Sequence, residues 1–179
     1  MKTKTVFAVF AAATLLTACQ TTPPEPPRAT AQLKPLKGSK VFGEANFEQR
    51  GDKVHISAVI QGLKPGGEYG FHIHEVGDCS GDGTNAKGHF NPFGSPHGHY
   101  GYSRADRHAG DLPSLRPPAK KNRRGRVQIN DDIEDISLEP GPANIIGRSI
   151  IVHARPDDFK TQPTGNAGAR LACGIIRAQ

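Results

Sequence analysis

Short segments of alternating apolar and polar residues follow one another along most of the chain. Apolar residues occupy every second position from Val54 to Ile60, and again at Val127 and Ile129. This is the period of a β-strand with one buried face, and no helical period of useful length accompanies it. The pattern predicts strands at about residues 31–37, 40–50, 53–61, 69–75, 111–118, 124–131, 145–154 and 169–177. Glycine-rich turns separate several of them, so we predict an all-β fold, an eight-stranded Greek-key β-sandwich or flattened barrel.

One long stretch departs from the strand pattern. Residues 76–110 are rich in glycine, show little apolar periodicity and contain four of the eight histidines. So long a loop inside a compact domain is usually either functional or disordered. Metal ligands are the simplest way to order it, and we therefore predict a long metal-binding loop.

The N-terminal segment has the features of an export signal. Lys2 and Lys4 precede an apolar run from Val6 to Leu16 that is too short and too early for a permanent membrane-spanning helix. The residues Leu16-Thr17-Ala18-Cys19 at its end resemble the lipobox of bacterial lipoproteins, in which cleavage before the cysteine leaves that cysteine lipid-modified. An ordinary small-residue cleavage site is the alternative.

This interpretation divides the chain into three parts. Residues 1–18 are the predicted signal peptide, residues 19–30 are the lipidated Cys19 with a proline-rich tether, and residues 31–179 form one domain. The sequence thus predicts an exported protein anchored to a membrane by its lipid, in the periplasm or at the cell surface.

Two cysteines remain after Cys19, namely Cys79 and Cys173. In the oxidising compartment that the export signal predicts, we expect them to pair, with two buried thiols as the alternative.

The net charge of +6 and the pI near 9.4 suit a polyanion, an anionic membrane surface or a small anionic substrate. Residues 120–126 are strongly basic, and we interpret them as a solvated hairpin tip. The more specific alternative is that these residues contact a polyanion or a membrane surface. No aromatic residue interleaves with these bases, so we expect no nucleic-acid partner.

Two histidines share one face of a predicted strand. In the segment 71–75, His72 and His74 project from the same face, while Phe71 and Ile73 face the other. A pair of surface histidines would explain this motif alone. Further candidate ligands follow it along the chain, however: His89, His97, His108, Asp111 and His153. Such clustering favours a metal site, because two adjacent nitrogen donors on a rigid strand suit a transition metal.

Five blocks of sequence around these residues closely resemble the copper/zinc superoxide dismutases. Their order and separations run from about residue 31 to the end of the chain, and five blocks in register are far more specific than one His-x-His motif. The blocks are Gly70-Phe71-His72-Ile73-His74-Glu75, Gly88-His89-Phe90-Asn91-Pro92, Arg107-His108-Ala109-Gly110-Asp111-Leu112, Ile145-Ile146-Gly147-Arg148 leading to His153, and residues 165–174 from Gly165 to Gly174.

The resemblance implies a two-metal site. Its implied copper ligands are His72, His74, His89 and His153, and its implied zinc ligands are His89, His97, His108 and Asp111. His89 would bridge both metals and carry a proton when the bridge opens at copper. Three histidines and one carboxylate fill a tetrahedral zinc site and leave it closed. Copper would stay open and cycle between two oxidation states, and the implied activity is dismutation of superoxide to dioxygen and hydrogen peroxide.

The resemblance also implies three supporting roles. Asp157 would link His72 to His97 and fix both rings, with an exposed loop acid as the alternative and Asp158 as a competitor. Arg170 would attract and orient the superoxide anion beside copper, with a structural salt bridge as the alternative. The disulfide Cys79–Cys173 would hold the loop near Arg170.

Several features depart from the family pattern. His99 lies two residues from His97 in a lengthened loop and competes with it as a zinc ligand, although we prefer His97. His55 is expected to be a surface or packed side chain. The segment from Phe159 to Thr164 is short and lacks the steering charges of the animal enzymes.

The sequence leaves the oligomeric state open, a homodimer included. The alternative function is a non-catalytic copper- and zinc-binding surface lipoprotein.

Overall fold

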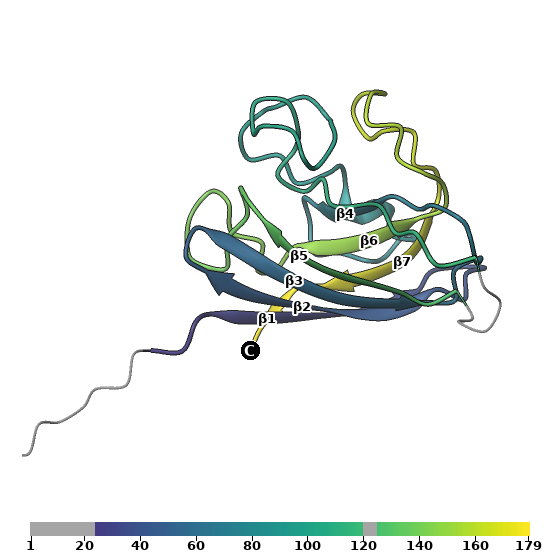
Figure 1. Ribbon diagram of the computed structural model, residues 1–179, viewed down its shortest axis with the longest axis horizontal. Coiled ribbons are helices and arrows are strands. Elements are labelled where there is room, and N and C mark those ends of the chain that lie inside the picture. Colours follow the sequence, from purple (N-terminus) through teal and green to yellow (C-terminus); the bar gives the residue numbers. More distant parts are fainter. Residues whose placement is uncertain (1–23, 120–124) are drawn as a thin grey trace, which may run out of the picture.

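The computed structural model describes residues 24–119 and 125–179 (Figure 1). The predicted signal peptide, the predicted lipidation site Cys19 and part of the basic run lie outside these residues. The strands are β1 (Arg28–Pro35), β2 (Phe42–Arg50), β3 (Lys53–Gln61), β4 (Phe71–His74), β5 (Val127–Ile133), β6 (Ser149–His153), β7 (Arg170–Ile175) and β8 (Arg177–Ala178). One 3-10 helix, η1 (Thr84–Ala86), lies between β4 and β5. The all-β prediction with eight strands is confirmed.

All strand pairs are antiparallel and form one curled sheet in the order β4-β6-β7-β1-β2-β3-β5, with β8 also paired to β1. The chain leaves β3 at one side for β4 at the other edge, returns to β5, and then crosses again to β6. These crossings give the Greek-key half-barrel. Strand β1 pairs with β2 along most of its length, with β7 at Lys34 and Pro35, and with β8 at Ala29 and Thr30.

The inward faces of the strands form the larger of two buried apolar clusters. In β3, every second residue from Val54 to Ile60 is buried, as the alternating pattern predicts. Phe47, Phe71 and Ile150 are fully or almost fully buried and pack into the same cluster. Each such side chain contributes roughly 1.5–3 kcal/mol of burial free energy.

The prediction of a strand at residues 111–118 is wrong. Only isolated bridges occur there, from Asp111 to His72 and from Leu115 to Tyr69. Pro113, Pro117 and Pro118 have no N–H group for a ladder, which explains why this segment does not become a strand. The eighth strand is instead β8, which continues the chain just beyond β7.

Several strand boundaries also differ from the prediction. β1 begins at Arg28, so residues 28–30 belong to the sheet rather than to the tether. β6 begins at Ser149 rather than at residue 145, because Gly147 turns the chain with a φ of 79°. These shifts move no candidate ligand out of the site.

Two loops lie on the same side of the sheet as β4 (Figure 1). The teal loop follows β4, and the yellow-green loop joins β6 to β7. Backbone pairing holds the first loop to β4, since Ile73 donates to the Gly110 carbonyl at 2.9 Å and accepts from the Phe90 N–H at 2.8 Å. Gly110 is required for this approach, because a Cβ there would lie 2.3 Å from the Ile73 oxygen. This pairing places His89 and Asp111 beside β4.

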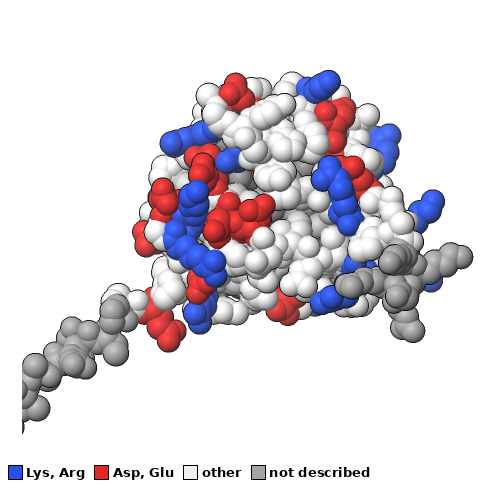
Figure 2. All heavy atoms as spheres, in the orientation of Figure 1, with Lys and Arg blue, Asp and Glu red and all other residues white. Residues whose placement is uncertain are grey.

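Basic and acidic side chains are intermixed on the face shown in Figure 2. Exposed ion pairs of the domain include Arg28 with Glu48 and Lys53 with Glu134. Such pairs contribute little stability, about 0–1 kcal/mol each. Within the described residues, no helix is long and apolar enough to cross a membrane.

Candidate metal centre

Two groups of buried side chains meet next to β4, and one histidine belongs to both. Within each group, one candidate ligand atom per residue lies within 4.8 Å of all the others. The first group is His72, His74, His89 and His153, and the second is His89, His97, His108 and Asp111. The structure therefore brings together all seven residues that the sequence analysis proposed as ligands.

Strand β4 explains how two histidines enter the first group. All four of its residues are buried, with Phe71 and Ile73 in the core and the two imidazoles on the opposite face. His153 ends β6, which pairs with β4, and its ring stacks near that of His74 with centroids 5.3 Å apart.

In the first group, each imidazole uses one nitrogen to fix its ring and points the other inward. His74 donates from Nδ1 to the Lys87 carbonyl at 2.9 Å, and His153 donates from Nδ1 to the Gly168 carbonyl at 3.3 Å. Their Nε2 atoms then face each other at 3.1 Å. Nδ1 of His72 and Nε2 of His89 are buried and have no hydrogen-bond partner. Four nitrogens thus converge.

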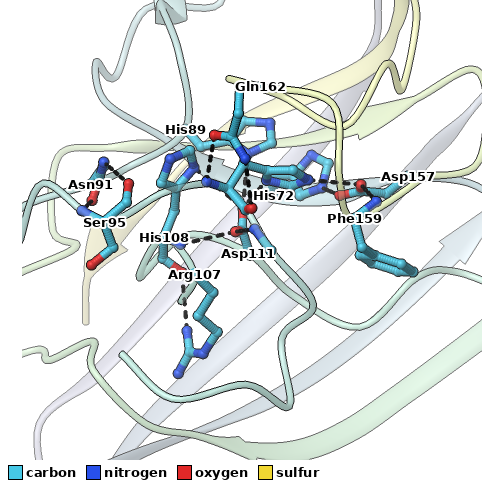
Figure 3. Close-up of polar contacts among 12 residues, drawn as sticks. His72, His89, Asn91, Ser95, Arg107, His108, Asp111, Asp157, Phe159 and Gln162 are labelled. Carbon is cyan, nitrogen blue, oxygen red and sulfur yellow. Dashed lines mark hydrogen bonds and ion pairs between the residues drawn. The ribbon is translucent and has the colours of Figure 1, made fainter. Parts of the chain in front are cut away.

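In the second group, three imidazole Nδ1 atoms surround one carboxylate oxygen. Asp111 Oδ1 lies 2.8 Å from His89, 3.1 Å from His97 and 3.6 Å from His108. The other oxygen, Oδ2, accepts from the backbone N–H groups of Gly98 and His108. These backbone bonds fix the carboxylate among the three rings (Figure 3).

The residues fit the two metals that the sequence resemblance implies. A tetrahedral ion with ligands at about 2.0–2.1 Å has ligand atoms about 3.3 Å apart. The spacings around Asp111 straddle that value. Buried nitrogens without partners are costly unless a ligand is bound, and three such nitrogens, in His72, His89 and His108, point into the groups. The two nitrogens of His89 face different groups, as a shared ligand requires.

Asp157 is hydrogen-bonded to one histidine of each group. Its carboxylate is buried and accepts from His72 Nε2 at 2.7 Å and from His97 Nε2 at 2.8 Å (Figure 3). These bonds leave Nδ1 of both rings for the groups. Asp158 is exposed and caps its own loop by accepting from Lys160 and Thr161. The geometry therefore favours Asp157 over Asp158.

The electrostatics divide the histidines into two kinds. Burial lowers the pKa of His89 to about 3, helped by the charge of His72, and burial holds the pKa of His74 and His153 well below the usual value. Burial also opposes a charge on His97, but its hydrogen bonds to Asp111 and Asp157 raise its pKa to about 9.

The pKa values of the two carboxylates are lowered, whereas that of His97 is raised. Burial opposes their charge, yet the histidines bonded to Asp111 and Asp157 hold the pKa of both well below its ordinary range. The metal-free site thus holds a proton on His97 between two carboxylates. A cation that replaced this proton would meet two ionised carboxylates, which is the state of these ligands that metal binding needs.

Arg170 lies at the edge of the first group. It is half-buried on β7, opposite His153 in the register, and donates to the carbonyls of Gly83 and Lys87. The Lys87 carbonyl also accepts from His74, so one peptide oxygen orients both side chains. Burial lowers the pKa of Arg170 from its usual value, but so strong a base stays charged.

The disulfide Cys79–Cys173 is present and holds the loop between β4 and β5 to strand β7. Its bond length is 2.08 Å, and the two residues are 94 positions apart. Gly83, which accepts from Arg170, donates its own N–H to the Cys79 carbonyl at 3.2 Å. Gly83 also has a φ of 80°, and a Cβ there would press on the Arg170 side chain at 3.2 Å.

The remaining two histidines lie outside the groups. His99 packs against Tyr100 and Phe159, and its Nδ1 accepts from the Gly101 N–H at 3.1 Å. The zinc-type group therefore contains His97 and not His99. His55 lies on β3 with its nitrogens 2.6 Å from an oxygen of Asp132 and 2.9 Å from that of Asn130, as a surface role predicts.

Two features of the site were missed from the sequence. One is the Lys87 carbonyl, which orients His74 and Arg170. The other is Gln162, whose side-chain amide contacts the peptide groups of His97. A backbone carbonyl carries no sequence signal, and a single glutamine in a Thr- and Pro-containing loop resembles an ordinary solvated residue.

Comparisons with known proteins agree with this geometry. The family description "Copper/zinc superoxide dismutase (SODC)" matches residues 41–176. "Superoxide dismutase [Cu-Zn] 2" of Aquifex aeolicus (strain VF5) is 39% identical over 155 residues, which cover 84% of this chain and 86% of the relative. "Extracellular superoxide dismutase [Cu-Zn]" of Caenorhabditis elegans is 33% identical over an alignment of 186 positions, which covers 98% of this chain and 78% of the relative.

A solved structure supports the same assignment. A double mutant of a SOD-like protein from Bacillus subtilis superposes with a TM-score of 0.71 at 38% identity, over 81% of this chain and 94% of that chain. The chain belongs to the copper/zinc superoxide dismutase family.

Proposed function

We propose that this protein converts two superoxide anions and two protons to dioxygen and hydrogen peroxide. The observation that carries the proposal is the pair of buried ligand groups that share His89. The first group offers four nitrogens and the second three nitrogens and a carboxylate, which suit copper and zinc respectively. When bound, copper supplies a centre that takes and gives single electrons, and zinc supplies a closed structural site.

His89 is the proposed carrier of a proton. Its Nε2 is buried without a hydrogen-bond partner and faces the first group, while its Nδ1 lies 2.8 Å from Asp111. Asp111 keeps the ring in one orientation, so Nε2 stays directed at the site. A proton held there lies where the peroxide product needs it.

Arg170 is the proposed guide for the substrate. Its guanidinium keeps a positive charge at the edge of the first group of imidazoles, and the Gly83 and Lys87 carbonyls fix its position. A fixed cation at the entrance of a low-dielectric site attracts a small anion and raises its association rate. Superoxide, a small monoanion, fits this environment.

A non-catalytic copper- and zinc-binding lipoprotein is the alternative function. Such a protein would need the ligands but not Arg170. Replacing Arg170 with alanine separates the two proposals, and Arg177→Ala on the exposed strand β8 is the matched control. For an enzyme, Arg170→Ala should lower the dismutation rate at least about tenfold, since charge steering contributes about 10- to 1000-fold.

In that experiment, both metals should remain bound to Arg170→Ala, and Arg177→Ala should behave like the unmodified protein. Equal dismutation rates in all three proteins would contradict the role of Arg170. Metal content, measured by mass spectrometry of the elements, shows whether a lower rate comes from metal loss.

We also propose export and lipid attachment at Cys19. The support is the lipobox-like segment before Cys19, the disulfide Cys79–Cys173 and a relative named as extracellular. The mass of the N-terminal peptide from the membrane fraction tests this, and an unmodified Cys19 would contradict it. A homodimer stays a prediction, which sedimentation of the purified domain tests.

A further inference from the structure

The segment after Asp157 holds His97 at its peptide groups as well as at its ring. Gln162 Oε1 accepts from the His97 N–H at 2.8 Å, and Gln162 Nε2 donates to the His97 carbonyl at 2.9 Å. Figure 3 shows the Gln162 side chain with both hydrogen bonds drawn. One side-chain amide therefore pairs with both polar groups of one residue.

The orientation of the amide follows from its surroundings. Nε2 lies near two carbonyl oxygens, those of His97 and Lys160, while Oε1 faces an N–H. Reversing the amide would place its oxygen against two oxygens, so the assignment of its atoms is unambiguous.

This pairing matters because His97 lies in an irregular stretch of the loop. No helix or strand is present between β4 and β5 other than η1 in the described residues, and His97 comes after η1. Its imidazole is nevertheless placed with Nδ1 at Asp111 and Nε2 at Asp157. The ring can keep both contacts only if the backbone of His97 stays in place, and Gln162 supplies contacts to that backbone.

We propose that Gln162 is a positioning residue for the zinc site, which holds the backbone of His97 so that Nδ1 stays directed at the metal. This inference rests on the zinc assignment made above. It adds a residue that touches no ligand atom and acts through a ligand's peptide groups. Loss of such a partner typically weakens metal binding about 10- to 100-fold.

The variant Gln162→Glu gives the sharpest test, because it keeps the shape and changes one donor into an acceptor. The new carboxylate would face the His97 carbonyl and break the pairing. Its negative charge alone would instead attract zinc and tighten binding. The two explanations therefore predict opposite changes. Gln162→Ala removes both contacts without adding charge, and Gln128→Glu, exposed on β5, is the control for charge.

The measurement is the zinc dissociation constant of each purified, metal-free full-length domain, by competition with a chromophoric chelator. We expect Gln162→Glu and Gln162→Ala to bind zinc about tenfold more weakly or worse, and Gln128→Glu to match the unmodified protein. Cobalt bound in place of zinc should show an altered visible spectrum in the two Gln162 variants. The copper dissociation constant should stay at its unmodified value, which also shows that the variants are folded.

Unchanged or tighter zinc binding by Gln162→Glu would overturn the proposal. So would equal weakening of zinc and copper, which indicates general loosening of the domain rather than positioning of His97. Failure of the proposed function is a separate result, because the unmodified protein itself would then fail to bind zinc or to dismutate superoxide.

Discussion

Asp157→Asn tests how the two metal groups are coupled. The carboxylate accepts from His72 at 2.7 Å and from His97 at 2.8 Å, so it orients one ring of each group. Asparagine has the same shape, but only its oxygen can accept a hydrogen bond. One of the two imidazoles must therefore lose its partner or change its tautomer.

The expected magnitude follows from these contacts. A hydrogen bond to a charged group contributes about 1.5–3 kcal/mol, and the substitution removes at least one. If most of that free energy serves to hold a ring in position for the metal, the affinity for that metal falls about 10- to 100-fold, which corresponds to about 1.4–2.8 kcal/mol. The loss should appear at zinc, at copper or at both, because either ring can be the one that is released.

The assay is chelator competition for each metal separately, with Asp158→Asn as the matched control. Asp158 is the adjacent exposed residue and carries the same charge, but it contacts neither histidine. Asp158→Asn should keep the affinities of the unmodified protein. If Asp157→Asn bound both metals as tightly as Asp158→Asn, the proposed coupling through Asp157 would be refuted.

Two further predictions use the same site. Gly165→Ala should weaken zinc binding, because its Cβ would lie 1.9 Å from an oxygen of Asp157. Gly51→Ala, which has the same φ of 61° but open space around it, should not; equal effects would mean that backbone strain alone is responsible. In the metal-free protein, the free energy of unfolding should fall as the pH drops below about 6.5, because histidines that stay neutral when folded gain protons only on unfolding; these are His74, His89 and His153. Each contributes at most about 1.4 kcal/mol per pH unit. His97, with its pKa raised to about 9, acts oppositely and loses its contribution as the pH rises from about 6.5 through 9. Urea unfolding in chelator at several pH values checks this, and a flat profile from about pH 5 to 9 would contradict it.

The strand pattern was readable from the sequence wherever burial alternates along a regular strand, as in β3. It failed at residues 111–118, where prolines remove the donors of a ladder. Periodicity reports which side chains face the core, and it does not report whether the backbone is paired. The short strand β8 was merged with β7 for the same reason.

The candidate ligands could be proposed from the sequence because their chemistry is carried by residue type and by the resemblance to one family. His97 and His99 could not be separated by residue type. The structure places His97 in the second group and packs His99 against Phe159. Gln162 could not be predicted, since its partner is a backbone 65 positions away. Contacts between side chains and peptide groups depend on how two loops are placed, which a single sequence does not reveal.

The most direct test of the account is the superoxide dismutation rate measured against metal content. We predict that protein with both groups occupied, one copper and one zinc per chain, is active and that its rate rises in proportion to bound copper. Protein loaded with zinc alone should be inactive. A fully loaded protein that is no faster than the zinc-only form would contradict the central claim.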